Sequence, residues 1–202
     1  NWTSQDLMDS DMAIDFSSPD SAVDNIHKAF KANVPIVVGT TGWNKDFDKV
    51  KNWCNEYNGA ILPSSNFSLG VNIFFEMNRQ LSKIMNRQKS YSVKIRETHH
   101  TEKVDSPSGT AITTAEIILE EMDHYSNWVS NTSNYGNKLP IIAKRQAGVA
   151  GTHQVIYESN IDELSISHRA KNRDGFAIGA IIAAEFLYNK KGLFSMKDVV
   201  KF

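Results

Sequence analysis

Cysteine is almost absent from this sequence: Cys54 is the only one among 202 residues. A single cysteine cannot form an intramolecular disulfide or supply a cysteine-rich zinc site, and it suits a reducing compartment, so we expect a cytoplasmic protein. Long apolar runs are also missing, and none approaches the roughly 18 residues that span a bilayer. We therefore expect no membrane partner.

An excess of either charge is the next absence. The sequence has 22 Lys+Arg against 23 Asp+Glu, a formal net charge of −1, and no run rich in lysine or arginine. Surfaces that bind nucleic acid need such positive charge, so we expect no nucleic-acid partner. Hydrophobic residues make up 41% of the sequence, which is enough for one large domain or two small ones with a buried core.

The first part of the sequence alternates between short apolar runs and amphipathic segments. Apolar runs at 12–16, 34–38 and 60–62 predict three buried strands, and the helical spacing of apolar residues between them predicts two helices. Strands and helices that alternate through short connections favour a parallel sheet with right-handed crossovers. We predict an α/β, Rossmann-like half of a doubly wound fold.

The pattern changes after residue 67. The spacing predicts helices at 68–85, 111–122 and 176–188, and strands at 91–97, 141–147, 153–158 and 163–168. Short links between the last three strands favour antiparallel hairpins, and the polar segment 124–138 reads as a surface loop. The sequence therefore predicts a second, α+β domain with a mainly antiparallel sheet over 68–176, while residues 177–202 return to the first domain, 1–67.

The densest polar segment, ETHHTEKVDSPSGTA at 97–111, lies between a predicted strand and a predicted helix. The adjacent side chains of His99 and His100 point in different directions, so one can move a proton while the other binds a ligand. Lys103 adds a cation close by. The alternative is that the two histidines are ordinary surface or structural residues.

The start of the predicted helix adds an anion-binding feature to this segment. The sequence Ser108-Gly109-Thr110 presents backbone N–H groups at the positive end of the helix dipole, which favours a carboxylate or a phosphate. A zinc site is not expected, because Cys54 is remote and no His-x-x-x-His pair occurs. The segment therefore predicts a site for an anion and for proton transfer.

Three loops follow the predicted parallel strands at their carboxyl ends, where open α/β sheets bind ligands. They contain Phe16 and Ser17, the sequence GTTG at 39–42, and the sequence SSNF at 64–67. The glycines allow the backbone to approach a ligand closely. The alternatives are an ordinary tight turn at 39–42 and a plain N-cap role for Asn66.

Basic side chains follow the last predicted strand, at Arg169, Lys171 and Arg173. We interpret Arg173 as a clamp for a second carboxylate, because its planar guanidinium suits that contact. A solvated basic turn is the alternative.

The segment 97–111 resembles the signature of the 4-hydroxy-tetrahydrodipicolinate (dihydrodipicolinate) reductases of bacterial lysine and diaminopimelate synthesis. That signature, E-x-H-H-x-x-K-x-D-x-P-S-G-T-A, agrees with this sequence at every fixed position. Segments at 39–42, 65–72 and 168–177 are similar to family segments in the same order. The resemblance covers nearly the whole chain, and it implies hydride transfer from NADH or NADPH to a cyclic dicarboxylate with loss of water.

The resemblance also implies roles for individual residues and domains. His99 is the implied proton donor and Lys103 its catalytic partner, while His100, the backbone of Gly109 and Thr110, and Arg173 bind the substrate. The implied nicotinamide site contains Phe16, Ser17, Gly39, Thr40, Thr41, Ser64, Ser65, Asn66 and Phe67. Residues 1–67 with 177–202 are the implied dinucleotide-binding domain, and 68–176 the substrate-binding and tetramerisation domain of a homotetramer.

One family segment is missing from the printed sequence. The family begins with a strand and a G-x-G-x-x-G loop that holds the pyrophosphate, whereas this sequence opens NWTSQD without an initiator methionine. We interpret the chain as truncated and expect it to bind cofactor poorly; an unchanged nicotinamide dissociation constant in an extended chain would contradict this. The family residue that contacts the 2′-hydroxyl or 2′-phosphate of the ribose is absent too. The sequence therefore does not decide between NADH and NADPH.

Two other functions remain alternatives at this point. One is a non-catalytic oligomerisation or anion-binding fragment. The other is a related acyl-semialdehyde dehydrogenase, which needs a nucleophilic cysteine at its substrate site. Cys54 lies in a predicted helical stripe of the first domain, which argues against the dehydrogenase.

Overall fold

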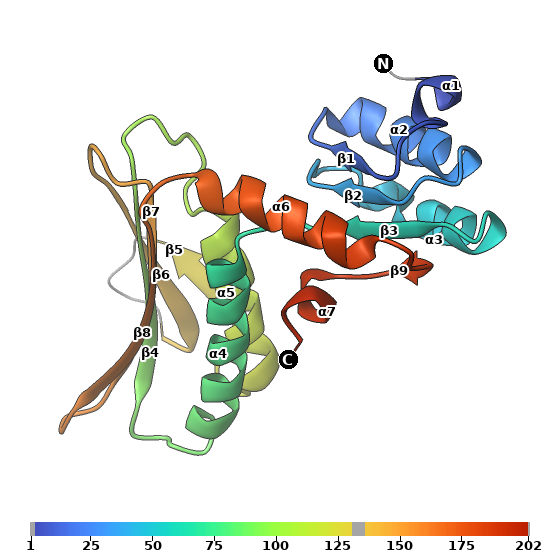
Figure 1. Cartoon of the computed structure of the whole chain (residues 1–202). Coiled ribbons are helices and arrows are strands. Elements are labelled where there is room, and N and C mark those ends of the chain that lie inside the picture. The colour runs from blue at the N-terminus through green and yellow to red at the C-terminus, as the bar shows by residue number, and fades with distance from the viewer. Residues whose placement is uncertain (1–2, 131–135, 202) are drawn as a thin grey trace. The chain divides into compact units, whose positions relative to one another are not determined.

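The computed structural model describes residues 3–130 and 136–201 and contains two compact units (Figure 1). Unit 1 combines residues up to Asn72 with residues from Asp174 onward, and unit 2 comprises Ile73–Arg173. Within the described ranges, no helix is both long enough and apolar enough to cross a membrane.

Unit 1 is built on a four-stranded sheet in which every neighbouring pair is parallel, in the order β1-β2-β3-β9. Its strands are β1 (Ala13–Asp15), β2 (Ile36–Val38), β3 (Ala60–Pro63) and β9 (Gly192–Leu193). Its helices are α1 (Ser4–Leu7), α2 (Pro19–Lys31), the 3₁₀ helix η1 (Asn44–Asp46), α3 (Phe47–Glu56), α6 (Asp174–Leu187) and α7 (Met196–Val200). The doubly wound parallel sheet predicted from the sequence is confirmed.

Both faces of this sheet are covered, because successive residues of each strand point to opposite sides. Ile36 and Val38 pack with apolar residues of α2 and α3 in one core cluster. Val37 packs with residues of α6 and α7 in another. All three β2 side chains are buried, and burial of an Ile or Val contributes about 1.5–3 kcal/mol. Because both faces of the sheet are buried, the strands have continuous apolar runs in the sequence rather than an alternating pattern.

Unit 2 contains a five-stranded mixed sheet in the order β5-β6-β4-β7-β8. The strands are β4 (Ser92–His99), β5 (Asn127–Ser130), β6 (Lys138–Arg145), β7 (Gly151–Glu158) and β8 (Glu163–Ala170). Two neighbouring pairs, β4–β7 and β7–β8, are antiparallel, and two, β4–β6 and β5–β6, are parallel. Two helices, α4 (Leu69–Met85) and α5 (Gly109–Glu121), lie on the same side of this sheet (Figure 1).

Helices α4 and α5 and one face of the sheet form the core of unit 2. The Nδ2 of Asn78 on α4 donates to the carbonyl of Thr114 on α5 at 3.1 Å, and Arg79 forms an ion pair of 2.9 Å with Glu121. The buried hydroxyl of Tyr157 on β7 pairs with Ser82 on α4 at 2.9 Å. These contacts hold α4 against α5 and against β7, the strand that pairs with β4.

Some details of unit 2 differ from the sequence predictions. Strands β6 and β7 were expected to form a hairpin, but β4 lies between them and pairs with both. A strand, β5, occupies part of the expected loop 124–138, and residues 131–135 of that loop lie outside the described residues. Both differences arise because pairing between strands depends on packing that local patterns do not encode.

Candidate active site

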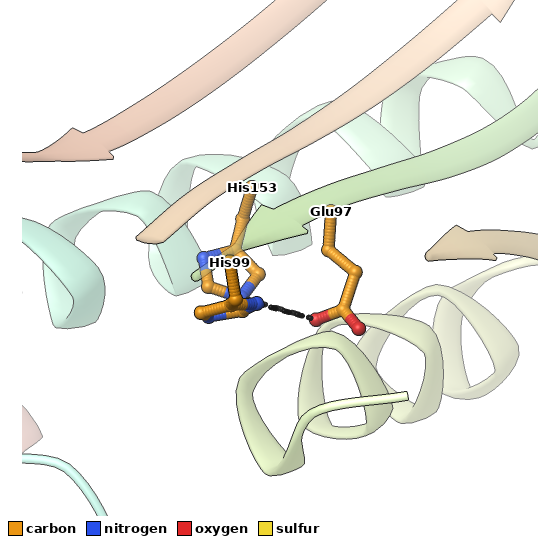
Figure 2. A group of neighbouring side chains, drawn as sticks. All are labelled: Glu97, His99 and His153. Atoms are coloured by element: carbon orange, nitrogen blue, oxygen red, sulfur yellow. Dashed lines mark ion pairs between the residues drawn. The ribbon is translucent and has the colours of Figure 1, made fainter. Parts of the chain in front are cut away.

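Glu97 and His99 lie on the same buried face of β4, since residues two apart along a strand share a face. The Glu97 side chain is fully buried and that of His99 is 9% exposed. Nδ1 of His99 lies 3.3 Å from Oε2 of Glu97 (Figure 2). This distance is within ion-pair range, but its geometry falls short of a hydrogen bond.

The Glu97 carboxylate is surrounded by donors from other elements. Its Oε1 accepts a 3.0 Å hydrogen bond from the backbone N–H of Ser108 and lies 3.5 Å from Nη1 of Arg145 on β6. Its Oε2 lies 3.7 Å from Nε2 of His153. Burial alone raises the pKa of Glu97, but the interactions with His153, His99 and Ser108 outweigh it and hold this pKa well below its usual range. Glu97 is therefore a buried carboxylate that stays ionised.

His153 reaches this cluster from β7, where it pairs directly with Glu97 across the two strands. Its Nε2 lies 3.1 Å from the Ser108 hydroxyl. Burial lowers the pKa of His153, and the interaction with Glu97 only partly opposes this. Ligand-type atoms of Glu97, His99 and His153 lie within 4.8 Å of one another, so among the described residues this group could hold a metal ion. The spacing along the sequence could not show this group, because its members come from different strands.

The loop after β4 carries Lys103, the predicted catalytic partner. Its Nζ forms an ion pair of 2.6 Å with Oδ1 of Asp105, and this hydrogen bond lowers the pKa of Asp105. Arg145 holds the loop by donating to the carbonyl oxygens of Lys103, at 3.3 Å, and Asp105, at 2.5 Å. Arg145 therefore ties the lysine loop to the strand that bears Glu97 and His99.

Helix α5 begins where the sequence predicted an anion site. Ser108 is its N-cap, and the Ser108 hydroxyl accepts a 3.2 Å hydrogen bond from the N–H of Ala111. Gly109 is exposed, and a Cβ added to it would meet nothing within 4 Å. Thr110, the next residue, is half-buried. The open space beside Gly109 leaves the positive end of a helix of 13 residues accessible to a carboxylate.

His100 and Arg173, both predicted to bind substrate, are close together in unit 2. Nη2 of Arg173 lies 3.5 Å from Nε2 of His100, and Nδ1 of His100 lies 3.9 Å from the carboxylate of Glu102. Arg173 is exposed. The two residues therefore present donors at one place although 72 residues separate them in the sequence.

In unit 1, a buried carboxylate joins two of the predicted cofactor loops. Oδ1 of Asp15, at the end of β1, accepts a 2.5 Å hydrogen bond from the Thr40 hydroxyl, and its Oδ2 accepts a 2.7 Å bond from Asn25. The Ser17 hydroxyl donates to the same carboxylate at 2.9 Å, and the Ser17 N–H donates to Thr40 at 2.8 Å. Asp15 and Asn25 were not among the predicted site residues, although Asp15 is a charge at the end of an apolar run.

Aromatic side chains lie beside this polar network. Phe16 is 59% exposed, and its ring lies 5.8 Å from the ring of Phe67, which is 1% exposed although it was also predicted to contact the cofactor. Gly39 is needed here, because a Cβ on it would overlap the Phe16 ring. An exposed flat apolar surface next to hydroxyl groups, at the carboxyl edge of a parallel sheet, fits a nicotinamide ring.

The third predicted cofactor loop is a hydrogen-bonded turn. The Ser64 hydroxyl donates to the carbonyl of Asn66 at 2.8 Å, and Oδ1 of Asn66 accepts a 2.9 Å bond from the N–H of Ser68. Asn66 therefore has a structural role before α4. Ser65 and Thr41 are exposed in their loops.

Cys54 does not have the properties of a nucleophile. It lies in α3 and is 3% exposed, its Sγ donates to the carbonyl of Gly59 at 3.5 Å, and burial raises the pKa of the thiol. A reactive cysteine needs a lowered pKa and access to its substrate. The acyl-semialdehyde dehydrogenase alternative therefore has no support in unit 1.

A doubly wound parallel sheet in one unit, and a histidine–lysine site beside a helix N-terminus in the other, define a reductase of the two-domain Rossmann class. The chain belongs to the dihydrodipicolinate reductase family: residues 3–67 match the family described as dihydrodipicolinate reductase, N-terminus, and residues 70–200 match the corresponding C-terminus. Reductases of this family use a nicotinamide cofactor.

Individual relatives agree with this assignment. The chain is 50% identical over 190 residues to a 4-hydroxy-tetrahydrodipicolinate reductase from Christiangramia forsetii, with 94% of this chain and 79% of that protein covered. It is 36% identical to the enzyme of the same name from Methanopyrus kandleri, over 95% of this chain and 72% of that protein. A dipicolinate-bound dihydrodipicolinate reductase from Paenisporosarcina sp. TG-14 has the same fold, with a TM-score of 0.80 at 21% identity over 96% of this chain and 76% of that one.

Proposed function

We propose that this protein reduces 4-hydroxy-tetrahydrodipicolinate to tetrahydrodipicolinate, using NADH or NADPH, in lysine and diaminopimelate synthesis. The observation that carries the proposal is the end of β4, where a buried histidine, a lysine and the N-terminus of α5 follow one another within residues 97–111. That segment has every fixed residue of the reductase signature. Net, the reaction adds a hydride and a proton to the substrate and releases the hydroxyl group as water.

In unit 2, His99 is the proposed proton donor. It is buried beside an ionised carboxylate, an arrangement that holds a proton close to a reacting group without exposing it to water. Lys103 is its proposed partner, because a second cation stabilises negative charge that develops on the ring during hydride transfer. His100, Arg173 and the N–H groups of Gly109 and Thr110 are the proposed ligands of the two substrate carboxylates.

In unit 1, the loops after β1, β2 and β3 are the proposed nicotinamide site. The cofactor, when bound, supplies the hydride. Phe16 offers exposed apolar ring surface with the buried ring of Phe67 packed behind it, and the Ser17 and Thr40 hydroxyls are held by Asp15. The further proposed contacts are Gly39, Thr41, Ser64, Ser65 and Asn66. Residues 1–67 with 177–202 are accordingly the proposed dinucleotide-binding domain, and 68–176 the substrate domain.

Assembly and location are proposed on the family resemblance. We propose a homotetramer formed through the second domain and a cytoplasmic location. Light scattering of the purified protein measures the assembly, and a monomer at working concentrations would contradict it.

The decisive experiment follows nicotinamide absorbance with freshly generated 4-hydroxy-tetrahydrodipicolinate. We expect consumption of NADH or NADPH, and we expect His99→Gln to lower kcat by about 10²- to 10⁴-fold, the usual contribution of a general acid. His124→Gln is the matched control, because His124 is a half-buried histidine of unit 2 outside the site. Full activity of His99→Gln would remove His99 from the chemistry. A protein that binds dicarboxylates without turnover would favour the alternative of a non-catalytic anion-binding fragment.

A further inference from the structure

Two buried atoms in unit 2 face each other without other hydrogen-bond partners. Among the described residues, neither Oε2 of Glu97 nor Nδ1 of His99 has a hydrogen-bond partner, and the two atoms are 3.3 Å apart. Figure 2 shows the ring and the carboxylate turned toward each other. Orphaned buried polar atoms are costly, and catalytic hydrogen bonds are commonly long before the substrate binds.

The opposite edge of the His99 ring has a different environment. A Cβ added to Gly151, the first residue of β7, would lie 3.2 Å from both Nε2 and Cδ2 of His99, tighter than nearly all real Cβ contacts. Glycine at this position therefore leaves the Nε2 edge uncrowded. The ring thus has its Nδ1 edge facing a carboxylate and its Nε2 edge free of any side chain from residue 151.

We propose that Glu97 is a positioning residue for His99: its carboxylate holds the hydrogen on Nδ1, so that Nε2 is the nitrogen that delivers the proton. This inference rests on the proposed function of His99. In the step itself, the Nε2–H bond of the imidazolium breaks and the proton passes to the substrate ring. The neutral His99 that remains keeps its hydrogen on Nδ1, which donates a hydrogen bond to the carboxylate of Glu97, and Glu97 stays ionised throughout.

Its surroundings keep Glu97 in the orientation that this role requires. Oε1 is already occupied by two donors, the Ser108 N–H at 3.0 Å and the Arg145 guanidinium at 3.5 Å. Only Oε2 is left for the rings of His99 and His153, at 3.3 and 3.7 Å. The carboxylate therefore cannot turn away from His99 without leaving a buried donor unpaired.

The same contacts argue against a resident metal ion at Glu97, His99 and His153. Nε2 of His153 is already within 3.1 Å of the Ser108 hydroxyl, and the Arg145 guanidinium supplies positive charge to the carboxylate. A cation added here would meet an existing one, which raises the electrostatic cost.

Glu97→Gln tests the proposal sharply, because the amide has one acceptor and one donor end. Its oxygen must face the Ser108 N–H and Arg145, so its NH₂ group must face Nδ1 of His99 and favour the opposite tautomer. We expect ¹⁵N NMR at neutral pH to show hydrogen on Nδ1 in the wild type and on Nε2 in the variant. This readout does not require turnover, so it tests Glu97 even if the proposed reaction fails.

Kinetics provide the second readout. We expect Glu97→Gln to lower kcat by about 10²- to 10⁴-fold while both Michaelis constants stay within about threefold. Glu97→Asp, which keeps the charge, should recover part of that loss. Gly151→Ala should also lower kcat, because it crowds Nε2, but it should leave the tautomer unchanged.

Glu121→Gln is the matched control, since it removes an ion-paired carboxylate of unit 2 that lies between α4 and α5. We expect it to keep wild-type kcat and tautomer. An unchanged His99 tautomer in Glu97→Gln would overturn the proposal, as would a kcat within about threefold of wild type. Loss of wild-type activity on chelation, with recovery on adding Zn²⁺, would also overturn it and assign the cluster to a metal.

Discussion

The hydroxyl of Thr40 donates a 2.5 Å hydrogen bond to the carboxylate of Asp15, and this contact joins the ends of β2 and β1. Neither residue is exposed, with Asp15 at 2% and Thr40 at 8%. The same carboxylate binds the Ser17 hydroxyl and Asn25. A single buried charge therefore organises two loops that the proposed function assigns to the nicotinamide.

Thr40→Val should weaken nicotinamide binding through these loops. The substitution is nearly isosteric but leaves the Asp15 carboxylate with one donor fewer, and hydrogen bonds to charged groups contribute about 1.5–3 kcal/mol. We expect the dissociation constant to rise by about tenfold or more, measured by titration with NADH and with NADPH. Thr40→Ser keeps the hydroxyl and should bind as wild type does. Equal affinity of the valine and serine variants would show that the loops keep their shape without this bond.

Lys103→Ala should weaken binding of pyridine-2,6-dicarboxylate, a planar mimic of the ring substrate. In the structure Nζ of Lys103 already pairs with a carboxylate, that of Asp105, at 2.6 Å. A carboxylate of the inhibitor can pair with Nζ of Lys103 in the same way. Loss of the lysine should therefore raise the inhibition constant of pyridine-2,6-dicarboxylate about tenfold or more. Lys138→Ala, an exposed lysine at the start of β6, is the control. Unchanged inhibition of Lys103→Ala would remove this lysine from the anion site.

Two glycines of α6 should respond to alanine in opposite ways. A Cβ on Gly179 would overlap the backbone carbonyl of Phe67, whereas a Cβ on Gly175 would meet only the Ser68 hydroxyl at 3.7 Å. Gly179→Ala should therefore destabilise unit 1 by about 1–3 kcal/mol, because overpacking exceeds the gain in helix propensity. Gly175→Ala should be neutral or slightly stabilising. Hydrogen exchange of the β2 and β3 amides measures both, and equal protection in the two variants would refute the close packing.

The stability of unit 2 should fall on acidification through those of its histidines whose pKa values burial lowers. Burial lowers the pKa of His153 from its ordinary value of 6.5. A histidine with a lowered pKa in the folded state is protonated first in the unfolded chain. Its contribution to stability is therefore present above pH 6.5 and is lost as the pH falls toward the folded-state pKa.

Urea unfolding measured between about pH 7 and 5 tests this dependence. We expect the free energy of unfolding to decrease over that range, and His153→Asn should flatten the slope. His124 and His168, the other histidines of unit 2 whose pKa values burial lowers, should contribute to the remaining slope. A slope that His153→Asn leaves unchanged would mean that His153 does not contribute.

Much of the local structure follows from neighbouring residues. Apolar runs predicted β1, β2 and β3. Helical spacing predicted α4, with a start only one residue from the observed one, and Ser108 predicted the start of α5. The motif at 97–111 identified the family without any knowledge of the fold. These predictions succeeded because strand and helix periodicity, helix capping and sequence signatures are properties of short segments.

Only the tertiary structure paired the strands and assembled the polar clusters. The position of β4 between β6 and β7 brings Arg145 and His153 to Glu97, and three segments of unit 1 converge on Asp15. The small strand β9 joins β3 from more than 100 residues away. Such contacts depend on which strands become neighbours, and that choice is made by burial of whole faces rather than by any local pattern.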